Sequence, residues 1–232
     1  MPEELSKEEL EARRAAVTDL GRAMRAAAVA VVTDEGPLDG LAEAAGLADR
    51  IASVLSTAPR PLSRLPIVDD LSMAVRYFSP VTGLGSALAP PLAFGVDGDE
   101  VVVRASFDQR FEGPPGHVHG GVTALVFDEI LGQAANNAGR WGMTVALHTD
   151  YRRALPLEVE LEFRSHVVSI EGRKTRVEGT ACLASAPGDI RVDAAATFVE
   201  PRQDKQDEYF GQLTDASGRS VPAQHGSLIA GR

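Results

Sequence analysis

The segment that most constrains the fold is a loop that leads straight into a helix-forming stretch, residues 113–138. Two prolines flanked by glycines at residues 113–116 mark the loop. From Gly121 to about Ala138 apolar residues and good helix formers follow one another, and Gly139 ends the pattern. The sequence therefore predicts a helix that begins directly after a tight loop.

Asp128 is the unusual residue of this predicted helix. At about 100° per residue, most polar residues of the segment fall on one stripe, which we interpret as its solvated face: Glu129, Gln133, Asn136, Asn137 and Arg140. Asp128 lies off that stripe, among small residues: Gly121, Ala124, Gly132 and Ala135. Because burying an isolated charge is costly, this carboxylate needs a partner or a chemical role. A structural aspartate that bonds to the backbone or forms an ion pair across a dimer is the alternative.

The start of the same helix provides a second chemical group. The first N–H groups of a helix have no partner within it, and the helix dipole favours negative charge there. Gly120 and Gly121 would let a ligand approach this backbone closely. Donors for a developing oxyanion at one end, with Asp128 about two turns later, favour acyl-transfer chemistry.

His119-Gly120-Gly121, Asp128 and Thr144 together resemble the hot-dog-fold acyl-CoA thioesterases of the phenylacetyl-CoA thioesterase type. The resemblance covers roughly Tyr77–Pro201 and includes four flanking segments: Tyr77–Gly83, Phe111–Gly116, Tyr151–Leu157 and Glu171–Lys174. It implies an α+β hot-dog fold, in which an antiparallel sheet wraps around one long central helix. It also implies an acyl-CoA substrate, a homodimer or homotetramer, and no cofactor or metal.

The resemblance assigns roles to single residues. Asp128 would activate water or attack the thioester carbonyl, and the N–H groups of Gly120 and Gly121 would polarise the thioester oxygen. Thr144 would reach the site from the partner subunit and help to hold the water. His119 would donate at the mouth of the site, or only bond the backbone. Arg173 and Lys174, in a turn between strands, would contact the coenzyme A phosphates, or would simply be solvated.

The remaining pattern predicts five strands and an irregular segment before them. Residues 69–92 are interrupted by glycines and prolines, and Glu100–Phe107 is rich in valine. Four more strands are expected after the helix, at Met143–Tyr151, Leu157–Ile170, Lys174–Ala184 and Ile190–Val199. One long helix followed by a run of antiparallel strands is typical of an α+β layer structure.

Both ends of the chain lie outside the resemblance. Ser6 and Glu9 form a capping-box signature, and apolar residues at helical spacing then predict two helices in residues 1–57. We expect this N-terminal helical extension to be an appendage that packs on its own domain or on its oligomer mate and is dispensable for chemistry. A membrane-surface or partner-binding element is the alternative. A proline-rich linker is predicted at 58–76, the hot-dog domain at 77–201, and a polar tail at 202–232 that is poorly ordered unless docked.

Composition limits the classes of partner and compartment. The formal net charge of −10 argues against nonspecific binding to nucleic acid or to an anionic membrane, and an anionic substrate would need a local basic patch. No stretch approaches the ~18 apolar residues of a membrane helix. Cys182 is the single cysteine, and the histidines show no ligand spacing, so we expect a cytoplasmic protein without a disulfide or metal.

Two other functions fit a hot-dog fold. A ligand-binding or regulatory protein would sense acyl-CoA without cleaving it. A dehydratase or hydratase would need an aspartate–histidine pair, and no histidine matches that spacing.

Overall fold

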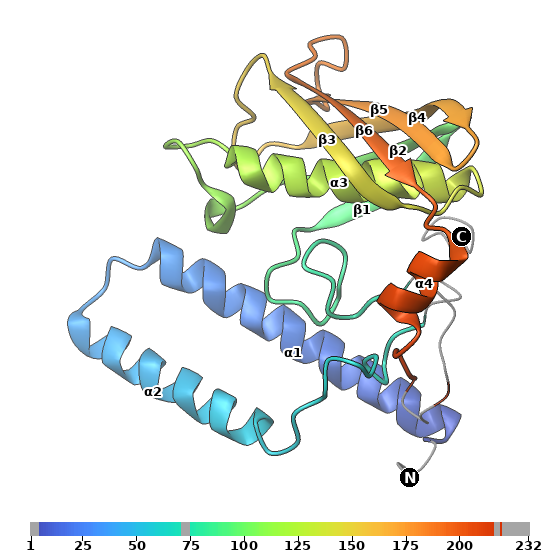
Figure 1. Ribbon diagram of the computed structural model, residues 1–232. Helices are drawn as coiled ribbons and strands as arrows, with labels where there is room; N and C mark the ends of the chain where they lie inside the picture. The colour runs from blue at the N-terminus through green and yellow to red at the C-terminus, as the bar shows by residue number, and fades with distance from the viewer. Residues whose placement is uncertain (1–4, 71–74, 216–218, 220–232) are drawn as a thin grey trace.

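The computed structural model of the protein describes residues 5–70, 75–215 and 219 (Figure 1). Its centre is an antiparallel sheet that packs along the helix α3 (Gly120–Asn137). The sheet has six strands in the order β1-β2-β4-β5-β6-β3. Their bounds are Leu92–Asp97 (β1), Glu100–Ala105 (β2), Met143–Tyr151 (β3), Leu161–Glu171 (β4), Lys174–Leu183 (β5) and Val192–Val199 (β6). The predicted α+β hot-dog fold is confirmed.

The sequence pattern missed strand β1. The other five strands and α3 lie where they were predicted, apart from shifts of a few residues at their ends. β1 follows two prolines, contains Gly95, and is mostly exposed because it forms one edge of the sheet. Such a strand shows little apolar alternation, and pairing with β2 across the turn at Gly98 is what defines it.

The core fills the space between α3 and the inner face of the sheet. Phe127 from α3 and Phe163 from β4 meet edge to face with ring centroids 5.4 Å apart, and Phe107 packs against Phe163 at 6.3 Å. These rings are fully buried, as are Ile130 and Leu131 of α3. Burial of each of these side chains contributes on the order of 2 kcal/mol, which fixes the face that α3 turns to the sheet.

The two predicted N-terminal helices are present as α1 (Lys7–Thr33) and α2 (Leu38–Leu55), and the capping box at Ser6 and Glu9 is formed. α1 is docked closely on the domain. A Cβ atom on Gly21 would lie 2.3 Å from the Leu84 carbonyl oxygen, so this helix position requires glycine. None of the residues of α2 is buried, and α2 lies far from the sheet (Figure 1). Helix α1 thus packs on its own domain, whereas α2 is exposed along its length.

The first part of the predicted C-terminal tail is ordered by docking. Residues Gln203–Phe210 form helix α4, whose Phe210 ring packs against Trp141 at 6.1 Å. Further along, the Leu65 N–H donates to the Thr214 carbonyl at 2.9 Å. These contacts hold the first part of the tail against the rest of the chain, and the polar composition of the tail alone did not predict them. The rest of the tail lies outside the described residues, except for Arg219.

No helix within 5–70, 75–215 and 219 combines the length and the apolar character needed to cross a membrane.

Candidate active site

The loop–helix junction is held by His119. This residue is the N-cap of α3, and its imidazole Nδ1 accepts a hydrogen bond from the Gly121 N–H at 3.0 Å. A ring nitrogen that accepts carries no proton, so in neutral His119 the proton is on Nε2. The His119 N–H in turn donates to the Phe111 carbonyl at 2.8 Å. In this structure His119 forms hydrogen bonds with the backbone. The Gly121 N–H can donate to a substrate only if its hydrogen bond to the His119 ring is broken.

Gly120 is held by a residue that the sequence pattern did not single out as functional. The Tyr151 hydroxyl, at the end of β3, donates to the Gly120 carbonyl at 2.7 Å. A Cβ atom on Gly120 would meet the Tyr151 ring at 3.5 Å, so ring and backbone are in close contact. Within the part of the chain that the structure describes, no acceptor bonds the Gly120 N–H. Of the two glycine donors, the Gly120 N–H is therefore the one left without an acceptor among the described residues.

Asp128 meets Thr144 within one chain. The Thr144 hydroxyl donates to Asp128 Oδ1 at 2.8 Å. This pairing needs no partner subunit, because β3 folds back along α3 and brings Thr144 to its own Asp128. Asp128 is half-buried and Thr144 is exposed. A half-buried carboxylate with one oxygen fixed and a route to solvent can act on a bound ligand.

The part of the polar stripe next to Asp128, formed by Glu129 and Gln133, is not a solvated face. Gln133 is only 5% exposed, and its Nε2 donates to Glu129 Oε1 at 2.9 Å. Burial raises the pKa of Glu129, and the neighbouring Asp128 charge raises it further, while Gln133 and Arg76 oppose the shift. The helical period correctly places Glu129 and Gln133 on one face of α3. That face is not open to solvent there, because the segment around Arg76 comes close to it. Glu129 is thus a carboxyl with a raised pKa beside Asp128. The sequence signal for it was the spacing of Glu129 and Gln133, which places them one helical turn apart.

The two predicted parts of the site are separated along α3. Gly120 and Asp128 are eight residues apart, which corresponds to about 12 Å along a helix. One thioester carbonyl needs its oxyanion donors and its attacking group each within about 3 Å. A single α3 therefore cannot present both groups to the same carbonyl.

Arg173 and Lys174 lie at the same end of the sheet as Thr144. Lys174 and Met143 both pair with Val199 of the strand between them, so Lys174 is two strand spacings, about 10 Å, from the residue before Thr144. Arg173 donates to the Glu200 carbonyl at 2.7 Å, and Arg140 bonds the Gly172 carbonyl in the same turn. Three basic side chains therefore gather here, and Lys174 is exposed.

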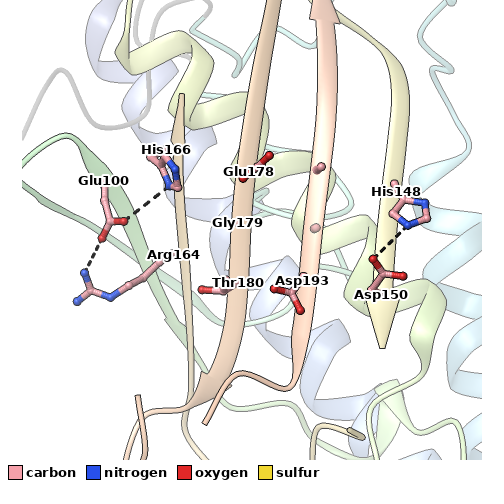
Figure 2. Close-up of a pocket in the computed structure, with 11 residues that line it drawn as sticks. Glu100, His148, Asp150, Arg164, His166, Glu178, Gly179, Thr180 and Asp193 are labelled. Carbon is pink, nitrogen blue, oxygen red and sulfur yellow. Dashed lines mark hydrogen bonds and ion pairs between the residues drawn. The ribbon is translucent and has the colours of Figure 1, made fainter. Parts of the chain in front are cut away.

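A different polar cluster covers the outer face of the sheet. A cavity of about 330 Å³ there is lined by His148, Asp150, His166 and Glu178, among others (Figure 2). These side chains alternate with the inward residues that pack on α3, so they lie on the face opposite to Asp128. Over the described residues no group of histidine, cysteine and acidic side chains is arranged to hold a metal ion.

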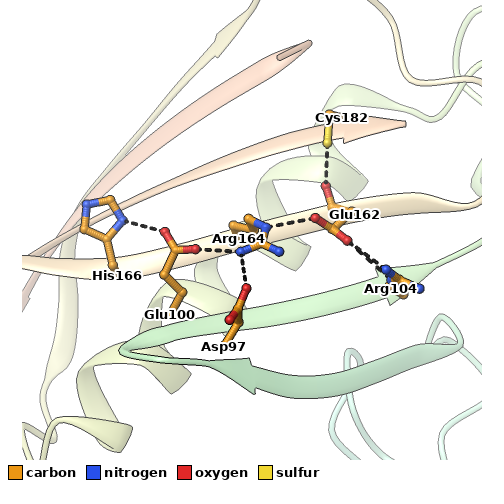
Figure 3. Close-up of polar contacts among 7 residues, drawn as sticks. All are labelled: Asp97, Glu100, Arg104, Glu162, Arg164, His166 and Cys182. Atoms are coloured by element: carbon orange, nitrogen blue, oxygen red, sulfur yellow. Dashed lines mark hydrogen bonds and ion pairs between the residues drawn. The ribbon is translucent and has the colours of Figure 1, made fainter. Parts of the chain in front are cut away.

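An ion-pair network continues on this outer face and ties the edge hairpin to the sheet. Arg164 of β4 bonds Glu162, Glu100 and Asp97 at 2.8, 2.8 and 3.0 Å (Figure 3). Bonds from Arg164 hold the pKa of Glu162 below its ordinary range, against its burial, and Arg104 adds to the effect. The network joins β1, β2 and β4, which is a structural role.

The geometry can be compared with known proteins. The crystal structure of a thioesterase superfamily protein superposes on this chain with a TM-score of 0.68 and 33% sequence identity, over 79% of this chain and 90% of that one. The chain belongs to the thioesterase superfamily. A model of the thioesterase superfamily also matches residues 115–185, which include His119, Asp128 and Thr144.

Curated acyl-coenzyme A thioesterases also match part of this chain. Acyl-coenzyme A thioesterase THEM4 of Xenopus laevis is 35% identical over 91 residues, which is 38% of this chain and 40% of the relative. The THEM4 protein of Rattus norvegicus is 34% identical over 96 residues, 41% of each chain. The match thus spans about two fifths of the length of these curated relatives.

Proposed function

We propose that this thioesterase superfamily member hydrolyses coenzyme A thioesters to a free acid and coenzyme A. The observation that carries the proposal is the hydrogen bond between Thr144 and Asp128, at the residues that motivated the resemblance. The names of the THEM4 relatives, which are 35% and 34% identical to this chain over 91 and 96 residues, support the same substrate class.

Asp128 supplies the reactive oxygen. With Oδ1 held by Thr144, the second oxygen, Oδ2, is left to take a proton from water or to attack the thioester carbon directly. In the first route the hydroxide adds to the carbonyl; in the second a mixed anhydride forms and water then cleaves it. In both, the carbon–sulfur bond breaks, the thiolate of coenzyme A leaves and takes up a proton, and a carboxylic acid is released.

Two chains complete one site in this proposal. Because Gly120 and Asp128 of one α3 are about 12 Å apart, the oxyanion donor next to Asp128 comes from the α3 start of a second copy. Strand β3 offers the surface for pairing: it is an edge strand, and Met143, Val145 and Tyr151 on it are 39%, 61% and 50% exposed. An edge strand of this length is normally covered, and a homodimer related by a two-fold axis would cover it.

The basic side chains at the β4–β5 turn bind the phosphates. The chain carries a net charge of −10, so a coenzyme A ester needs a local region of positive charge. Arg140, Arg173 and Lys174 provide it at the same end of the sheet as Thr144.

The test is hydrolysis of a panel of coenzyme A esters that differ in acyl length and aromatic character, followed by release of the thiol. Turnover of at least one ester by the wild type, lost in Asp128→Asn, is the expected result. Tight binding of these esters with no thiol release would instead identify a non-catalytic acyl-CoA-binding protein. Single turnover in ¹⁸O-water separates the two routes, because label enters the Asp128 carboxylate only when it is a nucleophile.

A further inference from the structure

A second cavity lies between helix α1 and the segment that leads into β1. It measures about 560 Å³, a size typical of ligand sites. We call it the α1 cavity; its lining combines apolar residues with four charged ones, Arg22, Arg25, Asp108 and Arg110. The apolar walls come from α1 (Ala26, Val29), from the segment before β1 and from β1 itself (Leu92, Phe94). Asp128, Thr144 and Gly120 are not among its lining residues.

The charged side chains of the α1 cavity leave an excess of positive charge. Arg110 and Asp108 neutralise each other through two hydrogen bonds of 2.8 Å. Arg25 donates from one terminal nitrogen to the Leu84 and Ser86 carbonyls, at 2.9 and 2.6 Å, which fixes its position without neutralising it. Burial, and then the nearby charges of Arg110 and Arg22, lower the pKa of Arg25, so the three cations are close enough to repel one another.

Arg22 adds to this excess. Its partner is Asp19 at 3.8 Å, and both side chains are at least 70% exposed, so the pair is weak. No other acidic residue than Asp108 lines the cavity within the described chain. A cavity with apolar walls and uncompensated arginines, in a protein of net charge −10, favours a ligand with an apolar tail and an anionic head.

We propose that the α1 cavity binds the carboxylate of an aliphatic acid, as a site separate from Asp128. Arg25 and Arg22 hold the carboxylate, and the aliphatic chain lies against Val29, Leu92 and Phe94. Helix α1 thereby supplies both the charge and one wall of a ligand site, a role that an appendage would not have. The proposal does not depend on thioester hydrolysis.

The test is calorimetric titration of the full chain with decanoate, with 1-decanol and acetate as comparison ligands. Decanoate should bind, 1-decanol should bind at least about tenfold more weakly because it lacks the charge, and acetate should not bind measurably because it lacks the tail. Equal affinity for decanoate and 1-decanol would overturn the charge argument. Failure of decanoate to bind would overturn the site itself.

Matched variants locate the ligand. Arg22→Gln should weaken decanoate binding several-fold, whereas Arg50→Gln, which removes the same charge from exposed α2, should not change it. Ala26→Trp, at an exposed position of α1 that lines the cavity, should abolish binding by filling the space while the melting temperature is kept. Asp128→Asn should bind decanoate like the wild type. Binding that survives Ala26→Trp, or that is lost in Asp128→Asn or displaced by coenzyme A, would place the acid elsewhere and overturn the proposal.

Discussion

Thr144, which forms a hydrogen bond with Asp128, lies directly before an irregularity in strand β3. The register of β3 against β6 shifts between Thr144 and Ala146, so Val145 is the extra residue of a bulge. Bulges re-aim side chains and occur next to active sites. Here the bulge turns Val145 outward, with 61% of it exposed, while Thr144 keeps its 2.8 Å hydrogen bond to Asp128 Oδ1. The edge strand and the central helix are thus joined at the proposed reactive carboxylate.

Asp128→Asn should keep the fold and lose most thioester hydrolysis. Asparagine has the same size and can still accept from Thr144, but it cannot take a proton or attack a carbonyl. Loss of a positioned base or nucleophile costs roughly 10²–10⁴-fold in turnover. Asp99→Asn is the matched control, because it removes the same charge from an exposed turn. A stable Asp128→Asn protein with wild-type turnover would contradict the proposed mechanism.

Thr144→Val should lower turnover by about tenfold, because it removes one hydrogen bond to a charged group, worth roughly 1.5–3 kcal/mol when fully formed. Thr144→Ser keeps the hydroxyl and should recover most of the rate. Steady-state kinetics compare the turnover of the two variants with that of the wild type, and sedimentation checks that both variants assemble normally. If serine does not rescue the rate while the assembly is intact, the methyl group of Thr144 matters and not its hydroxyl.

Glu129→Gln should raise the melting temperature at neutral pH. The pKa of Glu129 is raised in the folded protein, so folding favours its protonated form. Its contribution to stability is present below the pKa of the unfolded state, about 4.3, and is lost as pH rises through the folded pKa.

The difference between Glu129→Gln and wild type should therefore be largest at neutral pH and shrink as pH falls towards 4. Each 1 kcal/mol would move the melting temperature by roughly 2–4 °C in a domain of this size. Thermal melts of both proteins from pH 4 to pH 8 measure this difference in melting temperature. A variant less stable than wild type at neutral pH would show that ionised Glu129 is stabilising.

His119→Ala should destabilise the protein by about 1 kcal/mol, the usual value of an N-cap, because the Gly121 N–H loses its acceptor. His119→Asn restores a capping side chain and should recover the stability. Asparagine does not reproduce the Nε2–H donor of the imidazole, so activity separates the two roles. Full activity in His119→Asn would mean that His119 acts as a cap alone; a stable but slow variant would make it a donor to substrate.

Charge reversal of Arg173 and Lys174 to glutamate should raise KM for coenzyme A esters more than it lowers kcat. Contacts to remote phosphates bind the substrate and the transition state about equally. The effect should weaken with added salt, since Lys174 is exposed. Arg60 and Arg64 reversed together serve as the control, because they lie in the segment before the domain. An unchanged KM for the Arg173/Lys174 variant would place the phosphates at another surface.

The sequence by itself determined the elements whose signals are local. The loop with two prolines, the helix ended by Gly139 (φ +70°), the capping box at Ser6 and the alternating strands after the helix each depend on residues close together in the chain. The motif of His119, Asp128 and Thr144 also identified the candidate site. The predicted elements are present in the fold because their local preferences agree with the tertiary packing.

Tertiary structure decided what each helix face meets. Glu129 and Gln133 form a polar stripe in sequence, yet Gln133 is buried, because a helical period shows which residues share a face and not what covers that face. The pairing of Thr144 with Asp128 depends on β3 folding back along α3, and strand β1 depends on its partner β2. The close fit of Gly21 on Leu84 joins residues far apart in the chain, as does the cluster of Arg22, Arg25 and Arg110. Contacts of this kind are set by the packing of distant segments, and the sequence pattern has no local signal for them.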